Sequence, residues 1–217
     1  ARAIGARIQE HVRPGERALL LYPPSLEYID AFFGCLYAGV IAVPAYPPDP
    51  KRLQRTLPRL QAIISDSGAK LALTTSQIAM MARFLGAEAP ELNEMTWVAT
   101  DSIEDEEGQA LRREKVSPET VAFLQYTSGS TGDPNGVMLD HEAIFRNEEL
   151  IRRSFQIVDG DVGVHWLPLY HDMGLLGAVI QPVYSGCDSV LMSPLDFLKR
   201  PQRWVEAISR FGGTVSS

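Results

Sequence analysis

Short apolar, β-prone runs alternate with segments of helical periodicity along all 217 residues of the chain. Strands that alternate with helices form a mostly parallel sheet covered by helices on both faces. The sequence therefore predicts an α/β fold, with residues 215–217 opening one further strand. The predicted strands are residues 17–22, 40–43, 71–74, 96–99, 121–126, 162–167 and 189–192, and the predicted helices are 25–38, 53–67, 76–84, 141–151, 173–184 and 201–211.

Capping residues mark several of the predicted helix ends. Ser25 is a suitable N-cap, and Gly39 and Gly68 follow the last periodic residue of their helices. Pro201 stands near the start of the last predicted helix, and Gly212 follows its end. These signals bound the helices independently of their hydrophobic periodicity.

Four prolines lie between residues 44 and 50, directly after the second predicted strand. Proline fixes φ and lacks an amide N–H, so it does not continue a ladder of backbone hydrogen bonds. We therefore expect a rigid, extended loop that begins at Pro44 and includes Pro47, Pro48 and Pro50.

The charge balance argues against a nucleic-acid partner. Twenty basic and 27 acidic residues leave a net charge of −7, which repels a phosphate backbone unless basic residues gather in one patch. The sequence contains no such patch. Residues 101–108 hold five acidic residues, which we interpret as a solvated surface loop, with an electrostatic docking patch as the alternative.

The cysteines indicate the cellular compartment, and the uncharged stretches indicate whether the chain inserts into a membrane. Cys35 and Cys187 are the two cysteines, and neither belongs to a CxxC motif, so a disulfide framework and a zinc site are both excluded. We expect two buried thiols in a reducing cytoplasm. The uncharged stretches 31–43 and 173–187 are shorter than the roughly 18–20 apolar residues that cross a bilayer, so we expect no membrane insertion.

The segment from Tyr126 to Gly136 reads Y-T-S-G-S-T-G-D-P-N-G and follows a predicted buried strand. Small, hydroxylated and glycine-rich residues let backbone amides and hydroxyls approach the oxygens of a polyphosphate. The spacing fits neither a Walker loop nor a dinucleotide fingerprint. The alternative is a flexible turn, because Asn135-Gly136 by itself is typical of a type I′ hairpin turn.

This string resembles the phosphate-binding loop of adenylate-forming enzymes, [YF]-T-S-G-[ST]-T-G-x-P-K-G, at ten of its eleven positions. Two further segments, 44–48 (P-A-Y-P-P) and 166–175 (W-L-P-L-Y-H-D-M-G-L), resemble fatty acyl-AMP ligases. The resemblance covers essentially the whole chain. It implies that residues 1–217 are the front part of a large N-terminal adenylation domain, without the remainder of that domain or a small C-terminal domain.

The resemblance also implies a site for ATP and Mg²⁺. The loop residues expected to contact the β- and γ-phosphates are Thr127, Ser128, Gly129, Ser130, Thr131 and Gly132, and Asn135 and Gly136 complete the expected cofactor-binding set. Thr127 is also a candidate for reaching the metal, whose other ligands this chain leaves unknown. The pattern's lysine is replaced by Asn135, which removes a flexible cation from the loop.

A second implied site lies in the segment from His171 to Gly174, where the acyl carboxylate and a lipid tunnel are expected to meet. We assign His171 a catalytic and substrate-binding role, with a packed core histidine as the alternative. Asp172, Met173 and Gly174 are expected to bind substrate, with Gly174 giving clearance for an alkyl chain. Adjacent residues on an extended strand point to opposite faces, so we do not expect His171 and Asp172 to share a metal.

The activity that the resemblance implies is attack of a fatty carboxylate on the α-phosphate of ATP, giving acyl-AMP and pyrophosphate. The acyl group then passes to the phosphopantetheine thiol of an acyl carrier protein, often at the start of a polyketide or peptide assembly line. Two alternatives stay open: a long-chain acyl-CoA synthetase, and a nucleotide- or lipid-binding module without catalysis.

Asn135→Lys should strengthen ATP binding by the full-length protein. A charge-assisted hydrogen bond contributes about 1.5–3 kcal/mol, which corresponds to roughly ten- to a hundredfold in affinity. Isothermal calorimetry of both proteins with ATP measures the change. Equal affinities would show that this position no longer contributes to nucleotide binding.

Overall fold

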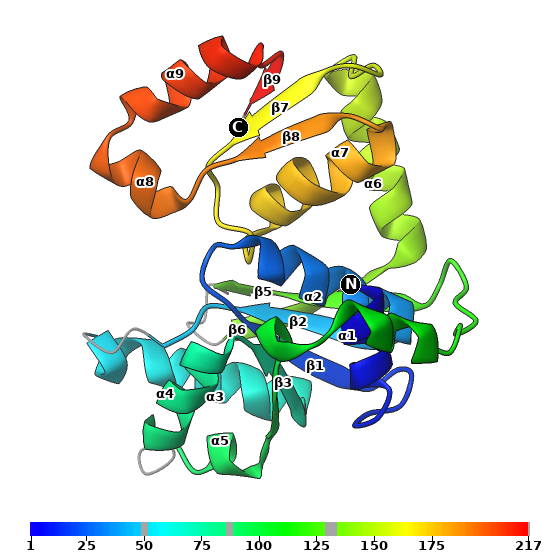
Figure 1. Ribbon diagram of the computed structural model, residues 1–217, viewed down its shortest axis with the longest axis vertical. Coiled ribbons are helices and arrows are strands. Elements are labelled where there is room, and N and C mark those ends of the chain that lie inside the picture. The colour runs from blue at the N-terminus through cyan, green and yellow to red at the C-terminus, as the bar shows by residue number, and fades with distance from the viewer. Residues whose placement is uncertain (49–51, 86–88, 129–133, 217) are drawn as a thin grey trace. The chain divides into compact units, whose positions relative to one another are not determined.

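The computed structural model describes residues 1–48, 52–85, 89–128 and 134–216, with backbone only at 83–85 and 128. The chain divides into two compact units, Ala1–His141 and Glu142–Ser217. We call them unit 1 and unit 2. Each has its own sheet and its own covering helices (Figure 1).

Unit 1 contains a six-stranded sheet with the order β4-β3-β1-β2-β5-β6. Every neighbouring pair is parallel except β5 and β6, which form an antiparallel hairpin. The predicted mostly parallel α/β fold is therefore confirmed. The strands are β1 (Arg17–Leu21), β2 (Ile41–Ala45), β3 (Leu71–Thr74), β4 (Thr96–Ala99), β5 (Val121–Ser128) and β6 (Pro134–Asp140).

Helices cover both faces of this sheet. In Figure 1, α1 and α2 lie on one face and α3, α4 and α5 on the other. The α-helices are α1 (Arg2–Ile8), α2 (Leu26–Ala38), α3 (Leu53–Ser67), α4 (Ser76–Leu85) and α5 (Glu91–Glu94), and two 3₁₀ helices follow β4, η2 (Thr100–Ser102) and η3 (Asp105–Ala110).

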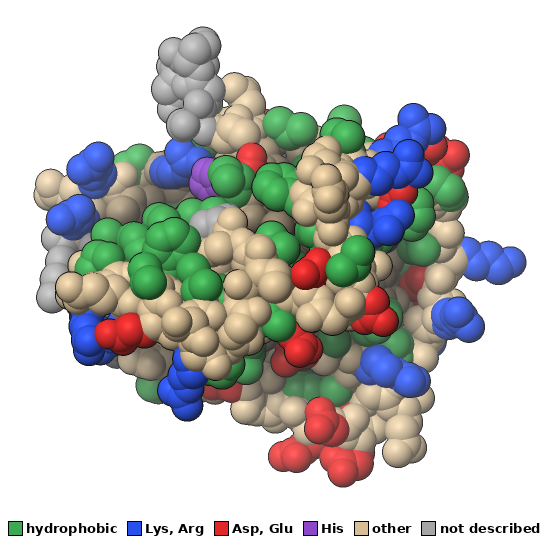
Figure 2. Space-filling model, turned by 90° about the horizontal axis from the view of Figure 1, so that it is seen from above, with side chains coloured by type: hydrophobic (Ala, Val, Ile, Leu, Met, Phe, Trp, Pro, Cys, Tyr) green, Lys and Arg blue, Asp and Glu red, His purple; other side chains and the backbone are tan. Residues whose placement is uncertain are grey.

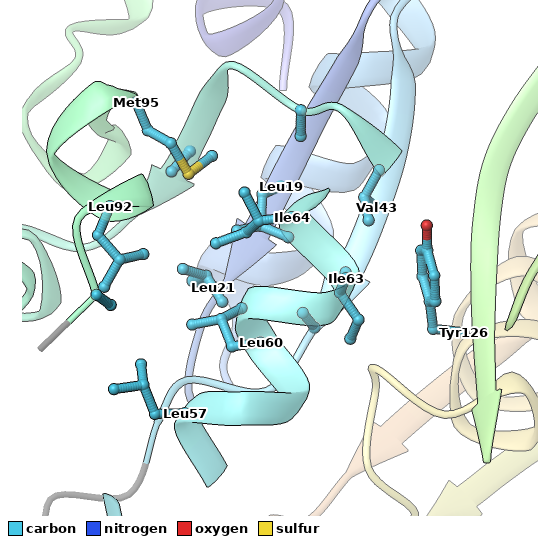
Figure 3. Close-up of a cluster of buried hydrophobic side chains, with 14 residues drawn as sticks. Leu19, Leu21, Val43, Leu57, Leu60, Ile63, Ile64, Leu92, Met95 and Tyr126 are labelled. Carbon is cyan, nitrogen blue, oxygen red and sulfur yellow. The ribbon is translucent and has the colours of Figure 1, made fainter. Parts of the chain in front are cut away.

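The apolar face of α3 forms the centre of one hydrophobic cluster (Figure 3). Its buried residues recur at the spacing of an amphipathic helix and pack against the buried strands β1 and β2. Tyr126 of β5 closes one side of the cluster (Figure 3). The labelled members are Leu19, Leu21, Val43, Leu57, Leu60, Ile63, Ile64, Leu92, Met95 and Tyr126.

Unit 2 contains a three-stranded parallel sheet with the order β8-β7-β9. Its strands are β7 (Val162–His165), β8 (Asp188–Leu191) and β9 (Val215–Ser216). Its helices are α6 (His141–Ser154), α7 (Gln181–Ser185), α8 (Pro194–Lys199) and α9 (Gln202–Phe211), and a π-helix, η4 (Met173–Ile180), runs directly into α7. The sequence predicted one regular helix over 173–184 and missed α8.

The predicted helix boundaries agree closely with the structure. Ser25 is the N-cap residue of α2, and Pro201 occupies that position in α9. Gly39, Gly68 and Gly212 end their helices in the left-handed conformation, with φ of 69°, 61° and 66°. Glycine adopts this conformation without the steric cost of a Cβ atom, which is why it marks these ends.

One prediction about a loop was wrong, and the alternative turn at Asn135-Gly136 does not form. Pro44 does not end the second strand: it lies inside β2, where it pairs in register with Leu20 of β1. Asn135 and Gly136 do not form a turn, because both belong to β6 and pair with Thr127 and Tyr126. The sequence analysis did not predict β6.

The acidic segment after β4 is more structured than the solvated loop that we expected. It contains η2 and η3, and Glu107 of η3 forms an ion pair with Arg7 of α1 at 2.5 Å. Gly108 permits this close approach, since a methyl group there would lie 3.2 Å from the amide nitrogen of Ala3. Part of the acidic run therefore fastens η3 to α1.

Both cysteines are free, but only Cys35 is fully buried, and Cys187 is partly exposed. The prediction of two buried thiols is correct for Cys35 alone. In the part of the chain that the structure describes, no helix has the length and apolar character needed to cross a membrane. On the face seen in Figure 2, several acidic side chains lie together at the lower edge, and basic side chains lie along both sides.

Candidate functional site

The loop with the phosphate-binding pattern connects the two strands of the β5–β6 hairpin in unit 1. Thr127 pairs with Asn135 and Ser128 with Pro134, so both flanks of the loop are held in an antiparallel ladder. Thr127 and Asn135 are exposed, which places a hydroxyl and an amide beside the loop. The side chain of Ser128 and the predicted site residues Gly129, Ser130, Thr131 and Gly132 lie outside the described residues.

The ring of Tyr126 packs against Gly136 on the paired strand. A methyl group at Gly136 would lie 2.9 Å from Cζ of Tyr126 and 3.0 Å from its hydroxyl oxygen. That hydroxyl donates a 2.6 Å hydrogen bond to Oδ2 of Asp66 on α3. Burial raises the pKa of Tyr126 further above neutral pH. The described geometry thus gives Gly136 a packing role that the motif alone did not indicate.

Unit 2 contains a largely apolar cavity of about 290 Å³. We call it the unit-2 cavity. Apolar side chains supply most of its wall: Ile151, Phe155, Ile157, Met173, Leu176 and Val215. Polar side chains contribute at a few places: Asn147, His165, Asp172, Gln181 and Ser216. A cavity of this size and character fits the apolar part of a small ligand.

The π-helix η4 and the start of α7 provide one side of this cavity. Lining residues recur at positions 172, 173, 176, 177 and 181, which is a spacing of four to five residues. A π-helix has i→i+5 hydrogen bonds, and such segments occur frequently at functional sites. Gly177 opens the wall, because a methyl group there meets no heavy atom of the described residues within 4 Å.

The predicted substrate-binding residues divide into two groups. Asp172 and Met173 line the cavity, and Met173 is 58% exposed. His171 and Gly174 are not among the lining residues. The clearance assigned to Gly174 is corrected: a methyl group at Gly174 would lie 2.0 Å from the carbonyl oxygen of Pro168, so this glycine admits the preceding backbone. Among the described residues, the open space beside this helix is at Gly177.

His171 and Asp172 lie on a turn that leads into η4 and not on an extended strand. Nδ1 of His171 is 2.6 Å from Oδ1 of Asp172, so the expectation that the two side chains point to opposite faces was wrong. The same carboxylate oxygen accepts a 2.7 Å hydrogen bond from the amide of Met173 and caps the helix. Within the described residues, no group of three His, Cys, Asp or Glu side chains is arranged to hold a metal ion.

Glu148 of α6 is fully buried beside the cavity. The amide nitrogen of Gln181 donates to Oε2 of Glu148 at 2.6 Å and to its main-chain oxygen at 3.0 Å. This orientation of the amide follows from the hydrogen-bond network, since the reverse would turn its oxygen toward two acceptors. Nδ2 of Asn147 donates to Oε1 at 3.3 Å. Desolvation raises the pKa of Glu148 to about 7.

The neighbouring carboxylate, Glu149, has the opposite environment. Arg152, Arg153 and the hydroxyl of Tyr184 all donate hydrogen bonds to it. These donors lower the pKa of Glu149 to about 2 and link α6 to α7. Two adjacent glutamates on one helix therefore titrate very differently, because one faces the interior and the other faces cationic donors.

His165 is a lining residue to which the sequence analysis assigned no role. It lies at the end of β7, is 4% exposed, and burial lowers its pKa. A methyl group at Gly163 would lie 2.4 Å from Nε2 of His165, so the imidazole ring covers Gly163 on the same face of the sheet. The i, i+2 spacing of Gly163 and His165 on a strand is the signal that was available in the sequence.

The profile of the AMP-binding enzyme family matches residues 1–217. The chain is 44% identical over 217 residues to the medium-chain-fatty-acid–[acyl-carrier-protein] ligase JamA of Moorena producens (strain JHB), with 100% of this chain and 37% of JamA covered. It therefore spans less than two fifths of that relative's length.

Two solved structures are similar to 99% of this chain, at 38% sequence identity. One is the crystal structure of a fatty acid AMP ligase from Legionella pneumophila, with a TM-score of 0.90 and 36% of that chain covered. The other is a fatty acyl-adenylate ligase from L. pneumophila in complex with acyl adenylate and pyrophosphate, with a TM-score of 0.88 and 37% of that chain covered. The resemblance found in the sequence is confirmed.

Gly174→Ala and Gly177→Ala should have opposite effects on stability, although the two positions are three residues apart in η4. The methyl group at position 174 overlaps the Pro168 carbonyl, and overpacking costs about 1–3 kcal/mol or more. The methyl group at 177 enters open space and removes glycine's backbone entropy, a gain of about 0.5–1 kcal/mol. Thermal unfolding of both variants of the full-length protein tests this, and equal effects would contradict it.

The free energy of unfolding of Glu148→Gln should increase relative to that of the parent protein as the pH rises from 5 to 8. A carboxyl with a raised pKa keeps its proton in the folded state while the unfolded chain loses it, so the parent's free energy of unfolding falls between pH 4.5 and 7. The fall is roughly 2–3 kcal/mol, and glutamine does not titrate. Unfolding midpoints measured at pH 5, 6, 7 and 8 give the difference.

Glu149→Gln is the matched control for this pH series. The pKa of Glu149 is lowered to about 2, so this carboxyl is ionised in both the folded and the unfolded state above about pH 5. Its stabilising contribution is lost only as the pH falls further. The effect of Glu149→Gln should therefore be constant from pH 5.5 to 8. A constant effect of Glu148→Gln over that range would contradict the prediction for the buried residue.

Proposed function

The chain belongs to the AMP-binding enzyme family, and from this membership we propose that the protein containing it is an ATP-dependent fatty acyl-AMP ligase. The proposed reaction joins a fatty carboxylate to the α-phosphate of ATP and releases pyrophosphate. We propose that residues 1–217 are part of its N-terminal adenylation domain. The observation that carries the fatty-acid assignment is the unit-2 cavity, because its apolar wall suits an alkyl chain.

The nucleotide is assigned to the β5–β6 hairpin. Its described flanks fit a triphosphate, since Thr127 and Asn135 are exposed and offer a hydroxyl and an amide. The residues proposed to contact the β- and γ-phosphates are Thr127, Ser128, Gly129, Ser130, Thr131 and Gly132, and Asn135 and Gly136 are the further proposed cofactor-binding residues.

We propose Mg²⁺ as the accompanying metal ion. Mg²⁺ is commonly bound through substrate phosphates, water and few protein ligands, so the hydroxyl of Thr127 is the proposed protein contact from this chain. When bound, the ion offsets the negative charge of the phosphate oxygens.

The proposed acyl site runs from an exposed mouth to a buried end. Asp172 and Met173 line the cavity near its exposed side, with His171 next to them in sequence. Nδ1 of His171 lies against the carboxylate of Asp172, so we assign the contact with the acyl carboxylate to Nε2 of the doubly protonated ring, in which both nitrogens are donors. This contact orients the carboxylate for attack, which is a positioning effect on a bimolecular reaction. Gly174 shapes this site through the backbone of Pro168.

The proposed substrate is a medium-chain fatty acid, and the proposed acceptor is the phosphopantetheine thiol of an acyl carrier protein. JamA, at 44% identity, supports both assignments through its name. Transfer to a carrier protein fits a place at the start of a polyketide or peptide assembly line. We also propose a cytoplasmic location, which is where ATP and carrier proteins meet.

ATP–pyrophosphate exchange by the full-length protein with saturated acids of six to eighteen carbons tests the adenylation step. We expect exchange to depend on the acid and to be greatest for medium chains. His171→Ala should lower exchange at least about tenfold, as expected for loss of a hydrogen bond to a charged group, and His11→Ala, at an exposed position in unit 1, should leave it unchanged. The isolated chain of 217 residues should not turn over at a useful rate.

Product analysis distinguishes the acceptors and the alternatives. Acyl transfer to a phosphopantetheinylated carrier protein supports the proposal, whereas acyl-CoA formed in quantity identifies an acyl-CoA synthetase. ATP binding without acid-dependent exchange would identify a binding module without catalysis, for which the neutral Asn135 in the loop is the feature to examine.

A further inference from the structure

We propose that His165 and Gln181 form the closed end of the unit-2 cavity and thereby limit the length of the acyl chain that the protein activates. This inference rests on the proposed function, because it assigns the far end of the alkyl chain to these two side chains. It concerns the buried part of the cavity wall, and not the exposed part to which Met173 belongs.

A second, smaller space of about 20 Å³ lies behind this end. The two spaces share five lining residues, namely Ile157, His165, Gly177, Gln181 and Val215. The smaller space continues along residues that do not line the larger one: Asp161, Gly163, Pro182, Cys187 and Asp188. We call the five shared residues the partition, because space lies on both sides of them. Their side chains determine where the larger cavity ends.

Three residues of the partition, Ile157, His165 and Gln181, are buried, whereas the mouth of the cavity is exposed. His165 is 4% and Gln181 3% exposed, compared with 58% for Met173 and 67% for Phe155. An alkyl chain that enters on the Met173 side therefore meets His165 and Gln181 at the deepest point. Gly177, also in the shared wall, has no side chain, so it adds nothing to the barrier.

His165 is held in this position from the strand below it. Its imidazole covers Gly163, where a methyl group would lie 2.4 Å from Nε2 and 3.2 Å from Cδ2. Gly163 lines only the smaller space, so the ring reaches from the partition toward that space. A side chain at position 163 would consequently displace the ring.

Gln181 is held in position from α6 and α7. Its amide nitrogen donates both hydrogens to Glu148, at 2.6 and 3.0 Å, and its oxygen accepts a 2.6 Å hydrogen bond from the hydroxyl of Ser185. Neither amide hydrogen is left for a ligand. The side chain therefore acts as a fixed wall and not as a hydrogen-bond donor to the substrate. Glu148 is a positioning residue for that wall.

His165→Ala in the full-length protein should join the two spaces and shift the preferred acid to a longer chain. Burying one more methylene raises kcat/KM for a longer acid about fourfold, so two additional methylenes give more than tenfold over the parent protein. The measurement is kcat/KM for ATP–pyrophosphate exchange across acids of six to eighteen carbons. The shift in the profile, and not the loss of rate, is the diagnostic result.

Gly163→Ala should act in the opposite direction, because its methyl group displaces the imidazole. We expect the preferred acid to become shorter and kcat/KM for the longest accepted acids to fall at least tenfold. In the Gly163→Ala/His165→Ala double variant this effect should disappear, since the ring through which it acts is absent. Such non-additivity would show that the two residues act through their mutual contact. Independent damage to the sheet would instead give additive effects.

His165→Leu tests whether the ring acts by its volume. Leucine fills comparable space without ring nitrogens, so the chain-length profile should stay close to that of the parent protein. Circular dichroism compares folding for each variant. If His165→Ala does not fold, the chain-length profiles of Gly163→Ala and His165→Leu test the inference instead. A shorter preferred acid in Gly163→Ala and an unchanged profile in His165→Leu would support it.

An unchanged profile in His165→Ala, or lower kcat/KM for all acids alike in both His165 variants, would overturn the inference and leave the proposed function standing. A parent protein that shows no acid-dependent exchange would overturn the proposed function itself. The two failures are therefore distinguishable in the same set of measurements.

Discussion

The close backbone contact between η4 and the turn before it is the constraint on which the cavity of unit 2 depends. Only a glycine at 174 permits the carbonyl of Pro168 to sit where a Cβ hydrogen would otherwise be. The contact fixes the start of the π-helix, and the wide helical turn then presents Asp172, Met173 and Gly177 to one cavity. The cavity is a consequence of this packing as much as of its apolar lining.

Buried polar groups organise the same region. Glu148 and Gln181 satisfy each other in the interior, which is the usual requirement for polar groups that are removed from water. Glu149, one residue further along α6, faces two arginines and Tyr184 and holds α7 from the surface. Helix α6 thus contacts α7 through a buried pair, Glu148 with Gln181, and through a more exposed pair, Glu149 with Tyr184. Both contacts favour a rigid wall for the unit-2 cavity.

Much of the fold was predictable because its signals are local. Local sequence alone predicts the strands β1, β3 and β4, because each is a short apolar run. It also predicts the ends of α2, α3 and α9, because a glycine follows each helix. The candidate site was less predictable. The loop motif indicated the hairpin as a place for an anion, but Gly174 was assigned to the cavity and Gly177 was not, because periodicity does not distinguish a π-helix from an α-helix.

The sequence by itself determined the α/β class, most of the strands and helices, and the family, since these follow from hydrophobic period, capping residues and a long specific motif. The tertiary structure decided that Pro44 lies in a strand, that Asn135 and Gly136 extend the hairpin, and that His165 lies over Gly163 beside Gln181. Those outcomes depend on contacts between residues that are distant in sequence or on which face of an element a side chain occupies, and neither is encoded in local pattern.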